Sequence, residues 1–350
     1  MSLSSLETPA LTVDLDLVER NIAAMQRYCD EHGLAFRPHI KTHKLPEIAR
    51  LQVDAGAVGI TCQKLGEAEV MADAGFDDIL VTYPLVGPHK ARRLAALARR
   101  VTMSVVGDSA AVAEGLSEVL GQEELEVDFL VECDTGLART GVQSPQGAAE
   151  LADLVTRLEG LRFAGLMTYP TRPESGPWLR EAREEIERLG LHVEKVSGGG
   201  TPTARTTHEI GEVTEVRAGT YVYGDRACIA NGSVPLDSCA LRVLATVVST
   251  PTRDRAILDA GSKTLTYDPA LGVSGYGLLV EHPDADVYLL NEEHGFVDVS
   301  RCDPPPAVAD TVTVVPNHAC GTTNMHDEVV VHRGGEVVAT WPVAARGKVR

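Results

Sequence analysis

The sequence contains one lysine whose neighbours could prepare it for covalent chemistry. Lys41 lies in the block Arg37-Pro38-His39-Ile40-Lys41-Thr42-His43-Lys44, which ends a β-rich run. Nearby positive charges and desolvation both lower the pKa of a lysine, and Schiff-base chemistry requires the neutral amine. A basic loop at the rim of a domain would have the same composition, so the block alone leaves both interpretations open.

Two later segments could bind a phosphate. Ser197–Thr201 and Arg217–Tyr221 each follow a β-rich run and each place glycine next to threonine. Glycine lets backbone N–H groups approach phosphate oxygens, and threonine adds a hydroxyl donor. One such turn is a weak signal, but two of them opposite a lysine at a strand end are a stronger pattern. The binding candidates are Gly199, Gly200, Thr201, Gly219, Thr220 and Tyr221.

A possible metal-binding pair lies near the C-terminus, in the segment Val315–Thr322. His318 and Cys320 are one residue apart, and on an extended chain their side chains would point to the same side. Two such ligands can share a cation whose remaining positions are filled by substrate and water. A buried thiol beside a hydrogen-bonded histidine is the usual explanation of a single His-x-Cys pair, so the spacing alone does not decide.

The arrangement of the predicted elements favours a barrel that could hold these residues at one end. Eight β-rich runs alternate with helical patterns, which predicts an α/β fold of the (β/α)8 TIM type rather than a doubly wound sheet. Active sites of such barrels lie at the carboxyl ends of the strands. The predicted strands are 35–40, 59–62, 79–83, 101–106, 127–132, 163–168, 193–197 and 215–218.

The pattern changes after about residue 236. Seven further strands are predicted, with turns between them and no helix, so we expect a barrel domain at 1–235 and an antiparallel β domain at 236–350. The predicted strands of the second domain are 240–249, 255–259, 278–280, 286–289, 311–315, 328–332 and 337–341.

Composition narrows the possible partners and location. The formal net charge is −18, which disfavours binding to nucleic acid or to acidic membranes. The odd count of seven cysteines shows no dense framework and suggests reduced thiols in the cytoplasm. Neither a signal peptide nor an apolar run approaching the roughly 18 residues of a membrane span is visible.

Taken end to end, the sequence resembles the D-threonine aldolase and D-serine dehydratase family. This group belongs to the fold-type III enzymes of pyridoxal 5′-phosphate (PLP), the alanine-racemase-like barrels. The resemblance runs from Thr8-Pro9-Ala10 to the segment Trp341–Gly347, and its most specific part is the block around Lys41. It implies that Lys41 carries PLP as a Schiff base, with His39 beside it, and that Lys44 has no such role.

The same resemblance implies roles for other residues. Arg139, in Asp134–Val142, would stabilise the phenolate oxygen of the cofactor, although a surface ion pair is the ordinary alternative. Tyr169 would lie near the cofactor ring, although tyrosines at strand ends also serve packing. Glu67 matches a family motif, and an acid that opens a helix explains it equally well.

The resemblance further implies a divalent metal at His318 and Cys320. The family places His-x-Cys or His-x-Asp at this position, and the soft cysteine ligand favours zinc, with manganese or magnesium as alternatives. His294 lies in another family block and is a weaker candidate for contact with the metal ligands or the substrate.

The resemblance implies a lyase acting on β-hydroxy-D-amino acids. The C-terminal tail favours the aldolase branch, which yields glycine and an aldehyde. The His-x-Cys pair favours the dehydratase branch, which yields a keto acid and ammonia. An amino-acid racemase and a non-enzymatic PLP-binding protein are further alternatives. The resemblance also implies a homodimer.

Overall fold

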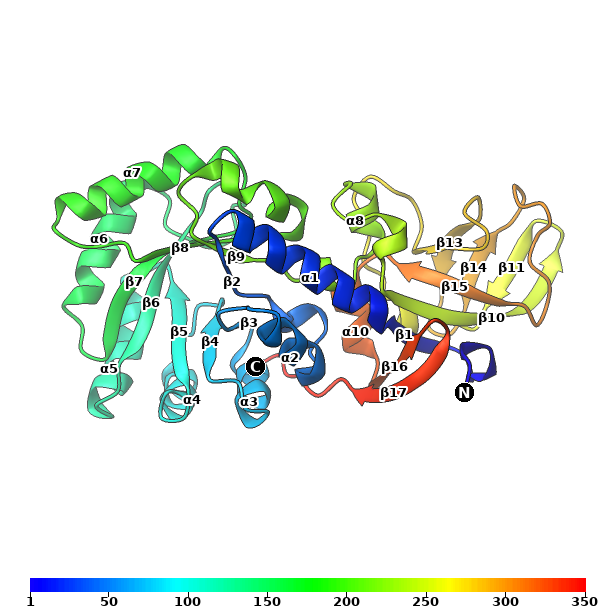
Figure 1. Ribbon diagram of the computed structural model, residues 1–350, viewed down its shortest axis with the longest axis horizontal. Coiled ribbons are helices and arrows are strands. Elements are labelled where there is room, and N and C mark those ends of the chain that lie inside the picture. The colour runs from blue at the N-terminus through cyan, green and yellow to red at the C-terminus, as the bar shows by residue number, and fades with distance from the viewer. The chain divides into compact units, whose positions relative to one another are not determined.

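The computed structural model describes residues 1–350, which form two compact units (Figure 1). The first, here called the β unit, comprises Met1–Ala24, Thr42–Ile48 and Thr220–Gly347. The second, here called the barrel unit, comprises Met25–Lys41, Ala49–Gly219 and Lys348–Arg350. The expected domain boundary after residue 235 stays a prediction, because compactness groups segments in space rather than along the chain.

The barrel unit contains eight parallel strands in the order β2-β9-β8-β7-β6-β5-β4-β3. An isolated parallel bridge between His39 and Thr61 joins β2 to β3, the two ends of this order. The predicted fold class and all eight predicted strands are confirmed, and the doubly wound alternative is wrong. The strands are β2 (Ala35–Phe36), β3 (Ile60–Cys62), β4 (Asp78–Val81), β5 (Thr102–Gly107), β6 (Val127–Cys133), β7 (Leu161–Thr168), β8 (Lys195–Gly199) and β9 (Glu215–Arg217).

Helices alternate with these strands, as the sequence predicts. In α6, Ser144 accepts a hydrogen bond from Gly147 N–H, and Pro145 occupies the first turn, where no N–H is needed. Its buried residues Ala148, Leu151, Ala152 and Val155 recur every three to four positions. The helices are α1 (Leu15–Glu31, shared between the units), α2 (Pro46–Asp54, shared likewise), α3 (Leu65–Asp73), α4 (Pro88–Ala98), α5 (Ala110–Gln122), α6 (Pro145–Thr156) and α7 (Ser175–Arg188), with a 3-10 segment at Thr201–Ile210.

The β unit is built on sheet strands in the order β13-β14-β11-β10-β1-β16-β17, and β15 pairs with both β10 and β12. The seven predicted strands are confirmed as β10 (Leu241–Thr252), β11 (Arg255–Leu258), β12 (Gly277–Leu279), β13 (Asp286–Leu290), β15 (Thr311–Pro316), β16 (Glu328–Arg333) and β17 (Glu336–Pro342). Two strands were not predicted: β1 (Ala10–Asp14) and β14 (Gly295–Asp298).

The expectation that this region lacks helices is wrong. Short helices occur there at α9 (Ser262–Leu265) and α10 (Ala319–Met325), and another, α8 (Arg226–Ala230), lies just before residue 236. Asp225 explains two of them, because its Oδ1 accepts from Cys228 N–H at 2.9 Å and its Oδ2 accepts from Ala319 N–H at 3.0 Å. One buried carboxylate thus caps the first turns of α8 and α10.

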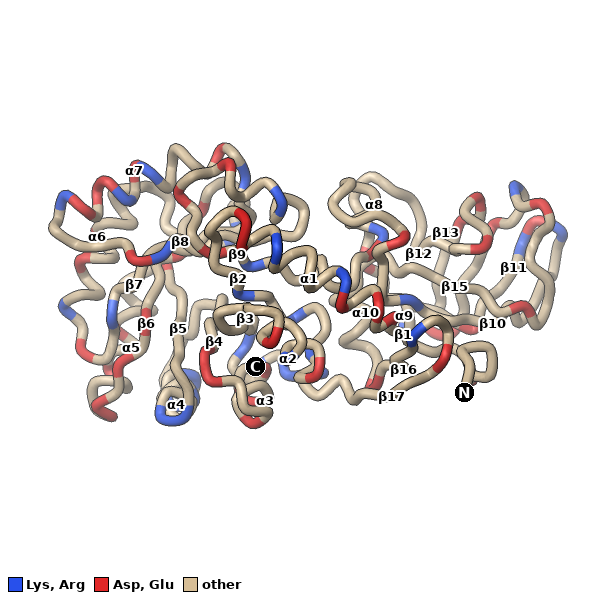
Figure 2. The backbone as a smooth tube through the Cα atoms, viewed as in Figure 1, with Lys and Arg blue, Asp and Glu red and all other residues tan.

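Charged residues of both signs are spread over the two units, with basic residues gathered on α4 (Figure 2). None of the helices combines the length and apolar character that a membrane crossing needs. All seven cysteines are free thiols.

Candidate active site

Lys41 lies directly after β2, in the 3-10 turn Ile40–Thr42 at the carboxyl end of the barrel strands. Its Nζ donates to Oε1 of Gln63 at 3.3 Å and lies 5.8 Å from the centre of the Tyr169 ring. Lys41 and Tyr169, both expected beside the cofactor, are therefore close to each other in the barrel unit. Gln63 was not predicted, because its importance depends on a contact between separate strands.

His39 is buried next to Lys41 and is held in its neutral form. Burial, with the positive charges of Lys41 and Arg217, lowers its pKa well below the usual range. Its Nε2 lies 3.1 Å from Oε1 of Gln63, an atom that can only accept, so Nε2 carries the ring hydrogen. Its Nδ1 then accepts a long, 3.4 Å hydrogen bond from the Lys41 N–H.

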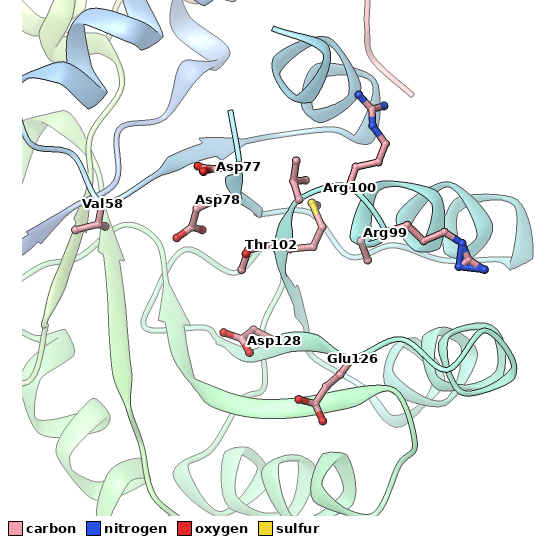
Figure 3. A pocket seen from close by; sticks show the side chains of 11 residues that line it. Val58, Asp77, Asp78, Arg99, Arg100, Thr102, Glu126 and Asp128 are labelled. Carbon is pink, nitrogen blue, oxygen red and sulfur yellow. The ribbon is translucent and has the colours of Figure 1, made fainter. Parts of the chain in front are cut away.

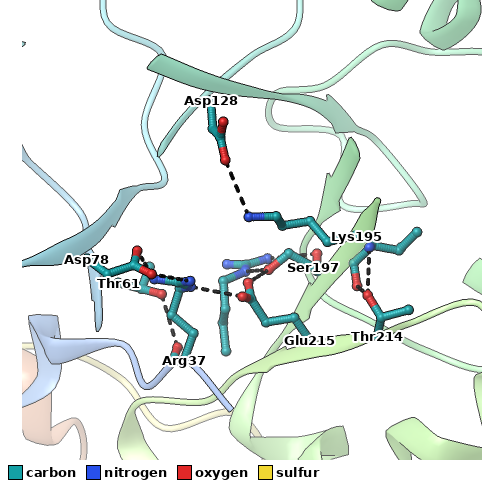
Figure 4. Close-up of polar contacts among 10 residues, drawn as sticks. Arg37, Thr61, Asp78, Asp128, Lys195, Ser197, Thr214 and Glu215 are labelled. Carbon is teal, nitrogen blue, oxygen red and sulfur yellow. Dashed lines mark hydrogen bonds and ion pairs between the residues drawn. The ribbon is translucent and has the colours of Figure 1, made fainter. Parts of the chain in front are cut away.

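Arg37, one of the positive charges in the block around Lys41, is paired with carboxylates. Arg37 is buried and forms ion pairs with Asp78 at 2.6 Å and Glu215 at 2.9 Å (Figure 4). The Arg37 charge lowers the pKa of Glu215 against the opposing effect of burial. Because two carboxylates compensate its charge, Arg37 contributes an ion-paired cation to the polar interior of the barrel.

The same polar interior contains Arg217, which was not singled out from the sequence. Its Nε donates to Ser197 Oγ at 2.8 Å, and Nη2 donates to the Thr168 carbonyl at 2.7 Å. Burial lowers the pKa of Arg217 to about 10. Ser197 also donates to Glu215 at 2.5 Å, so Arg37 and Arg217 are linked through hydrogen-bonded partners.

Tyr169 is the residue around which the other cofactor candidates gather. The Arg139 guanidinium lies 5.2 Å from the centre of the Tyr169 ring. Arg139 forms no close ion pair, although its charge lowers the pKa of Glu132 against the effect of burial, and its role beside the cofactor stays a prediction. A methyl group added at Gly200 would lie 3.6 Å from Tyr169 Cε2, which places that backbone against the ring.

The glycine segment after β8 provides space rather than free donors. Gly199 N–H donates to Thr171 Oγ1 at 2.6 Å, and Gly200 N–H donates to the Arg217 carbonyl at 3.2 Å. Gly200 has φ of 122°, a conformation that favours glycine. Thr201 is buried at the start of the following 3-10 segment. The N–H groups of Gly199 and Gly200 are therefore already used within the protein. They could bind a phosphate, as predicted, only after these hydrogen bonds rearrange.

The remaining candidates of the second glycine segment divide between the units. Gly219 ends the barrel portion, and Thr220 and Tyr221 begin the β unit in the 3-10 turn Thr220–Val222. Within the β unit, the Thr220 hydroxyl lies 3.9 Å from the sulfur of Cys320. Thr220 is thus near the predicted metal pair, a placement that the phosphate interpretation did not foresee.

A cavity of about 480 Å³ opens at the carboxyl ends of β3 to β6. Its lining consists of Gln63, Thr82, Tyr83, Pro84, Val86, Lys90, Glu132, Arg139 and Thr140. A larger pocket of about 710 Å³ lies at the opposite, amino ends of the strands and is surrounded by charged side chains such as Asp78, Glu126 and Asp128 (Figure 3). Because chemistry in such barrels occurs at the carboxyl ends, we assign the candidate active site to the smaller cavity.

The pair His318 and Cys320 lies at the start of a helix, so the extended-chain argument for it is wrong. His318 is the extended residue that precedes α10, and Cys320 is in the first turn. The two side chains nevertheless interact, because a hydrogen bond with Cys320, together with Asp268, raises the pKa of His318 to about 9. Helix geometry at this point brings the imidazole and the thiol together.

Asp268 is the partner of this pair that the sequence did not reveal. Its Oδ2 lies 2.8 Å from Nδ1 of His318, which leaves Nε2 to face a ligand. The Thr42 hydroxyl, which belongs to the residue after Lys41, lies 3.3 Å from the Cys320 sulfur in the same unit. No group of three or more histidine, cysteine or acidic side chains forms a ready metal cage. A cation here would take two protein ligands.

The other candidates have different surroundings. Glu67 is buried, and its Oε2 accepts from Gln63 N–H at 2.7 Å, so it does more than open helix α3. Lys44 donates to Asn324 at 2.9 Å within the β unit. His294 is exposed in the turn between β13 and β14, and its contact with His318 or Cys320 stays a prediction.

Comparison with known proteins decides the family. Residues 13–227 match the alanine racemase N-terminal domain model, and residues 240–332 match the model described as "Putative serine dehydratase domain". A D-threonine aldolase from Arthrobacter sp. is 37% identical, with 99% of this chain and 94% of the relative covered. The chain belongs to the D-threonine aldolase and D-serine dehydratase family. The predicted family is confirmed, and with it the prediction of a lyase at the level of the family.

Solved structures of this family agree with the fold. A D-threonine aldolase from Filomicrobium marinum is 34% identical, has a TM-score of 0.94, and is covered over 98% of its length by 100% of this chain. A D-threo-3-hydroxyaspartate dehydratase from Delftia sp. HT23 is 31% identical, with a TM-score of 0.87 and 97% and 98% coverage of the two chains. A cysteine-to-alanine variant of a D-threo-3-hydroxyaspartate dehydratase is described as metal-free.

Proposed function

We propose that this family member is a PLP- and divalent-metal-dependent lyase that cleaves β-hydroxy-D-amino acids in a retro-aldol reaction. The observation that carries this proposal is the placement of Lys41 at the carboxyl end of the barrel, near Tyr169 and Gln63. The 37% identity to a D-threonine aldolase over almost the whole chain supports the choice of reaction.

The barrel residues fit a bound PLP. Lys41 would form the covalent link, Tyr169 would lie against the cofactor, and Gly200 would bring backbone without a side chain close to the Tyr169 ring. Arg139, whose guanidinium lies 5.2 Å from the centre of the Tyr169 ring, is suited to an anionic oxygen. Gly219 and Thr220 remain phosphate candidates. Neither of their N–H groups donates a hydrogen bond to a backbone carbonyl in the turns and loops.

The β unit fits a divalent cation held by His318 and Cys320. Asp268 fixes the His318 ring so that Nε2 faces outward, an arrangement common for metal-bound histidine. The raised pKa of His318 means that a metal would displace a proton on binding. The thiolate ligand favours zinc over manganese or magnesium.

The two groups supply complementary chemistry when bound: PLP is an electron sink for charge at Cα, and the cation is a Lewis acid at the β-hydroxyl. The protein's own residues would orient the substrate and transfer protons. Lys41 Nζ, held by Gln63, is the group positioned to transfer a proton at Cα. The neutral His39 keeps this part of the site free of an additional positive charge.

Dehydration is the second candidate reaction. It is favoured by the pair His318 and Cys320. Variants of a D-threo-3-hydroxyaspartate dehydratase replace a histidine and, two positions later, a cysteine, and the cysteine variant is described as metal-free. This chain has the same His-x-Cys spacing. A racemase, by contrast, would need no metal, and the likeness to an alanine racemase at 14% identity and a TM-score of 0.72 shows the fold alone.

A product assay tests the proposal. The full chain, loaded with PLP and zinc or manganese, is incubated with D-threonine, L-threonine and 3-hydroxy-D-aspartate. The proposal expects glycine and an aldehyde from the D-substrates. Keto acid with ammonia in place of glycine would support dehydration, and racemised substrate alone would overturn both lyase reactions. Lys41→Ala is the control for background conversion.

We also propose that the chain forms a homodimer in the cytoplasm, and that residues 236–350 act as the metal-bearing domain. Small amino-acid substrates agree with the names of the relatives. Sedimentation velocity of the purified protein tests the dimer. Enzymatic activity that sediments with the mass of a monomer would contradict it.

A further inference from the structure

Gln63 joins the lysine region to the cavity at the barrel mouth. It follows β3, forms part of the wall of the 480 Å³ cavity, and contacts two cofactor candidates through one atom. Its Oε1 accepts from Lys41 Nζ at 3.3 Å and from His39 Nε2 at 3.1 Å. The same oxygen therefore affects both the direction of the amine and the tautomer of the imidazole.

The orientation of the Gln63 amide is fixed by its other contacts. Its side-chain nitrogen donates to the Thr82 carbonyl at 3.0 Å, and its backbone N–H donates to Glu67 Oε2 at 2.7 Å. If the amide were reversed, its NH₂ group would face the donors of Lys41 and His39, and its oxygen would face the Thr82 carbonyl. Only one orientation satisfies every partner.

Glu67 gains a role from this arrangement. It is the third residue of α3, and its side chain reaches back past the helix start to the backbone of Gln63. This resembles the reciprocal capping of helix N-termini by a glutamate in the first turn. Because Glu67 is buried, its contact with the Gln63 backbone is shielded from solvent, unlike that of an exposed acid in a first helical turn.

We propose that Gln63 is a positioning residue that aims the Lys41 amine and holds His39 in its Nε2–H form, with Glu67 and Thr82 fixing Gln63 itself. The inference rests on the proposed role of Lys41 as the PLP lysine. It assigns a function to Glu67, which the proposed reaction does not otherwise use, and extends the function of Gln63 from Lys41 to His39.

The choice of an amide at this position has a physical consequence. A neutral oxygen orients an ammonium group without the charge of a carboxylate, which would stabilise the protonated amine. An alkyl side chain would remove the acceptor and destabilise the protonated amine. Charged or titratable groups near Lys41 and Gln63 include His39, Tyr169, Arg139, Arg217 and Glu67, and Glu132 and Lys90 line the same cavity as Gln63. None of them changes in the variants that test the proposal.

The test measures how fast the full chain, freed of PLP, forms its lysine–PLP absorbance at different pH values. We expect Gln63→Glu to move the midpoint up by about one pH unit, which is tenfold less neutral amine at a given pH. Gln63→Leu should move it down by about the same amount. Gln122→Glu, which adds the same charge at the exposed end of α5, should leave the midpoint unchanged.

Opposite shifts are expected only if Oε1 faces the amine, because a packing defect would move both variants in one direction. Shifts in the same direction, no shift in either variant, or an equal shift in Gln122→Glu would overturn the proposal. Gln63→Asn withdraws the oxygen without adding charge and replaces the leucine variant if that does not fold. If the parent chain forms no adduct with PLP, the proposed function fails instead, and the two failures are distinguishable.

Discussion

Replacing Asp268 by asparagine should weaken metal binding without removing either proposed ligand. Asp268 Oδ2 accepts from His318 Nδ1 at 2.8 Å, and this bond both orients the ring and makes Nε2 more basic. Loss of such a partner typically costs roughly 10- to 100-fold in metal affinity. The His318 and Asp268 side chains are 45% and 46% exposed, so solvent screens their interaction. We therefore expect a loss near tenfold, or about 1.4 kcal/mol.

Competition with a coloured zinc chelator measures this affinity directly on the full chain. Asp284→Asn removes an exposed carboxylate from the same unit and is the matched control. Thermal unfolding of the metal-free proteins separates binding from folding. Equal zinc affinity in the parent and the Asp268→Asn variant would refute the reasoning, because it would show that the carboxylate does not orient the ligand.

Three further predictions concern burial, pH and the thiol ligand. Arg37→Met should lower the free energy of unfolding by about 3–5 kcal/mol, because it leaves Glu215 buried without its cation. Urea titration measures this change, and a loss below about 1 kcal/mol would contradict the ion-pair account. Stability should fall as pH drops below about 6.5, because unfolded histidine binds a proton that the buried His39 resists; an identical pH slope in His39→Gln would assign the effect elsewhere. Cys320→Ala should reduce zinc affinity far more than Cys29→Ala, which alters a buried thiol in α1, and equal losses in dialysis measurements would rule out Cys320 as a ligand.

The eight barrel strands could be predicted because their signals are local. Strands such as β6 are buried along nearly their whole length, and most of their residues are apolar. Neither strand β1 nor its position in the sheet of the β unit could be predicted from the sequence. It pairs with β10 on one side and β16 on the other, both more than 200 residues away.

Helix α10 illustrates why the geometry of the metal pair was misjudged. Its first N–H group is satisfied by Asp225, 94 residues earlier in the chain, so the local sequence has no ordinary capping signal. The residue types of His318 and Cys320 were sufficient to mark the pair, but their backbone conformation depended on a tertiary contact.

The lysine block shows a similar division. Its position at a strand end followed from the alternation of strands and helices, and the structure agrees. The charges around Lys41 did not follow, because Arg37 pairs with carboxylates from β4 and β9, and His39 loses its charge on burial. Contacts between strands, such as that of Gln63 with Lys41, are visible only after folding.

The most direct test of the account is to identify the lysine that binds the cofactor. The full chain is incubated with PLP, reduced with borohydride, digested and analysed by peptide mass spectrometry. The account predicts a phosphopyridoxyl group on Lys41 and none on Lys44, whose side chain is hydrogen-bonded to Asn324. Modification of Lys44, or of a lysine outside the barrel mouth in place of Lys41, would contradict it.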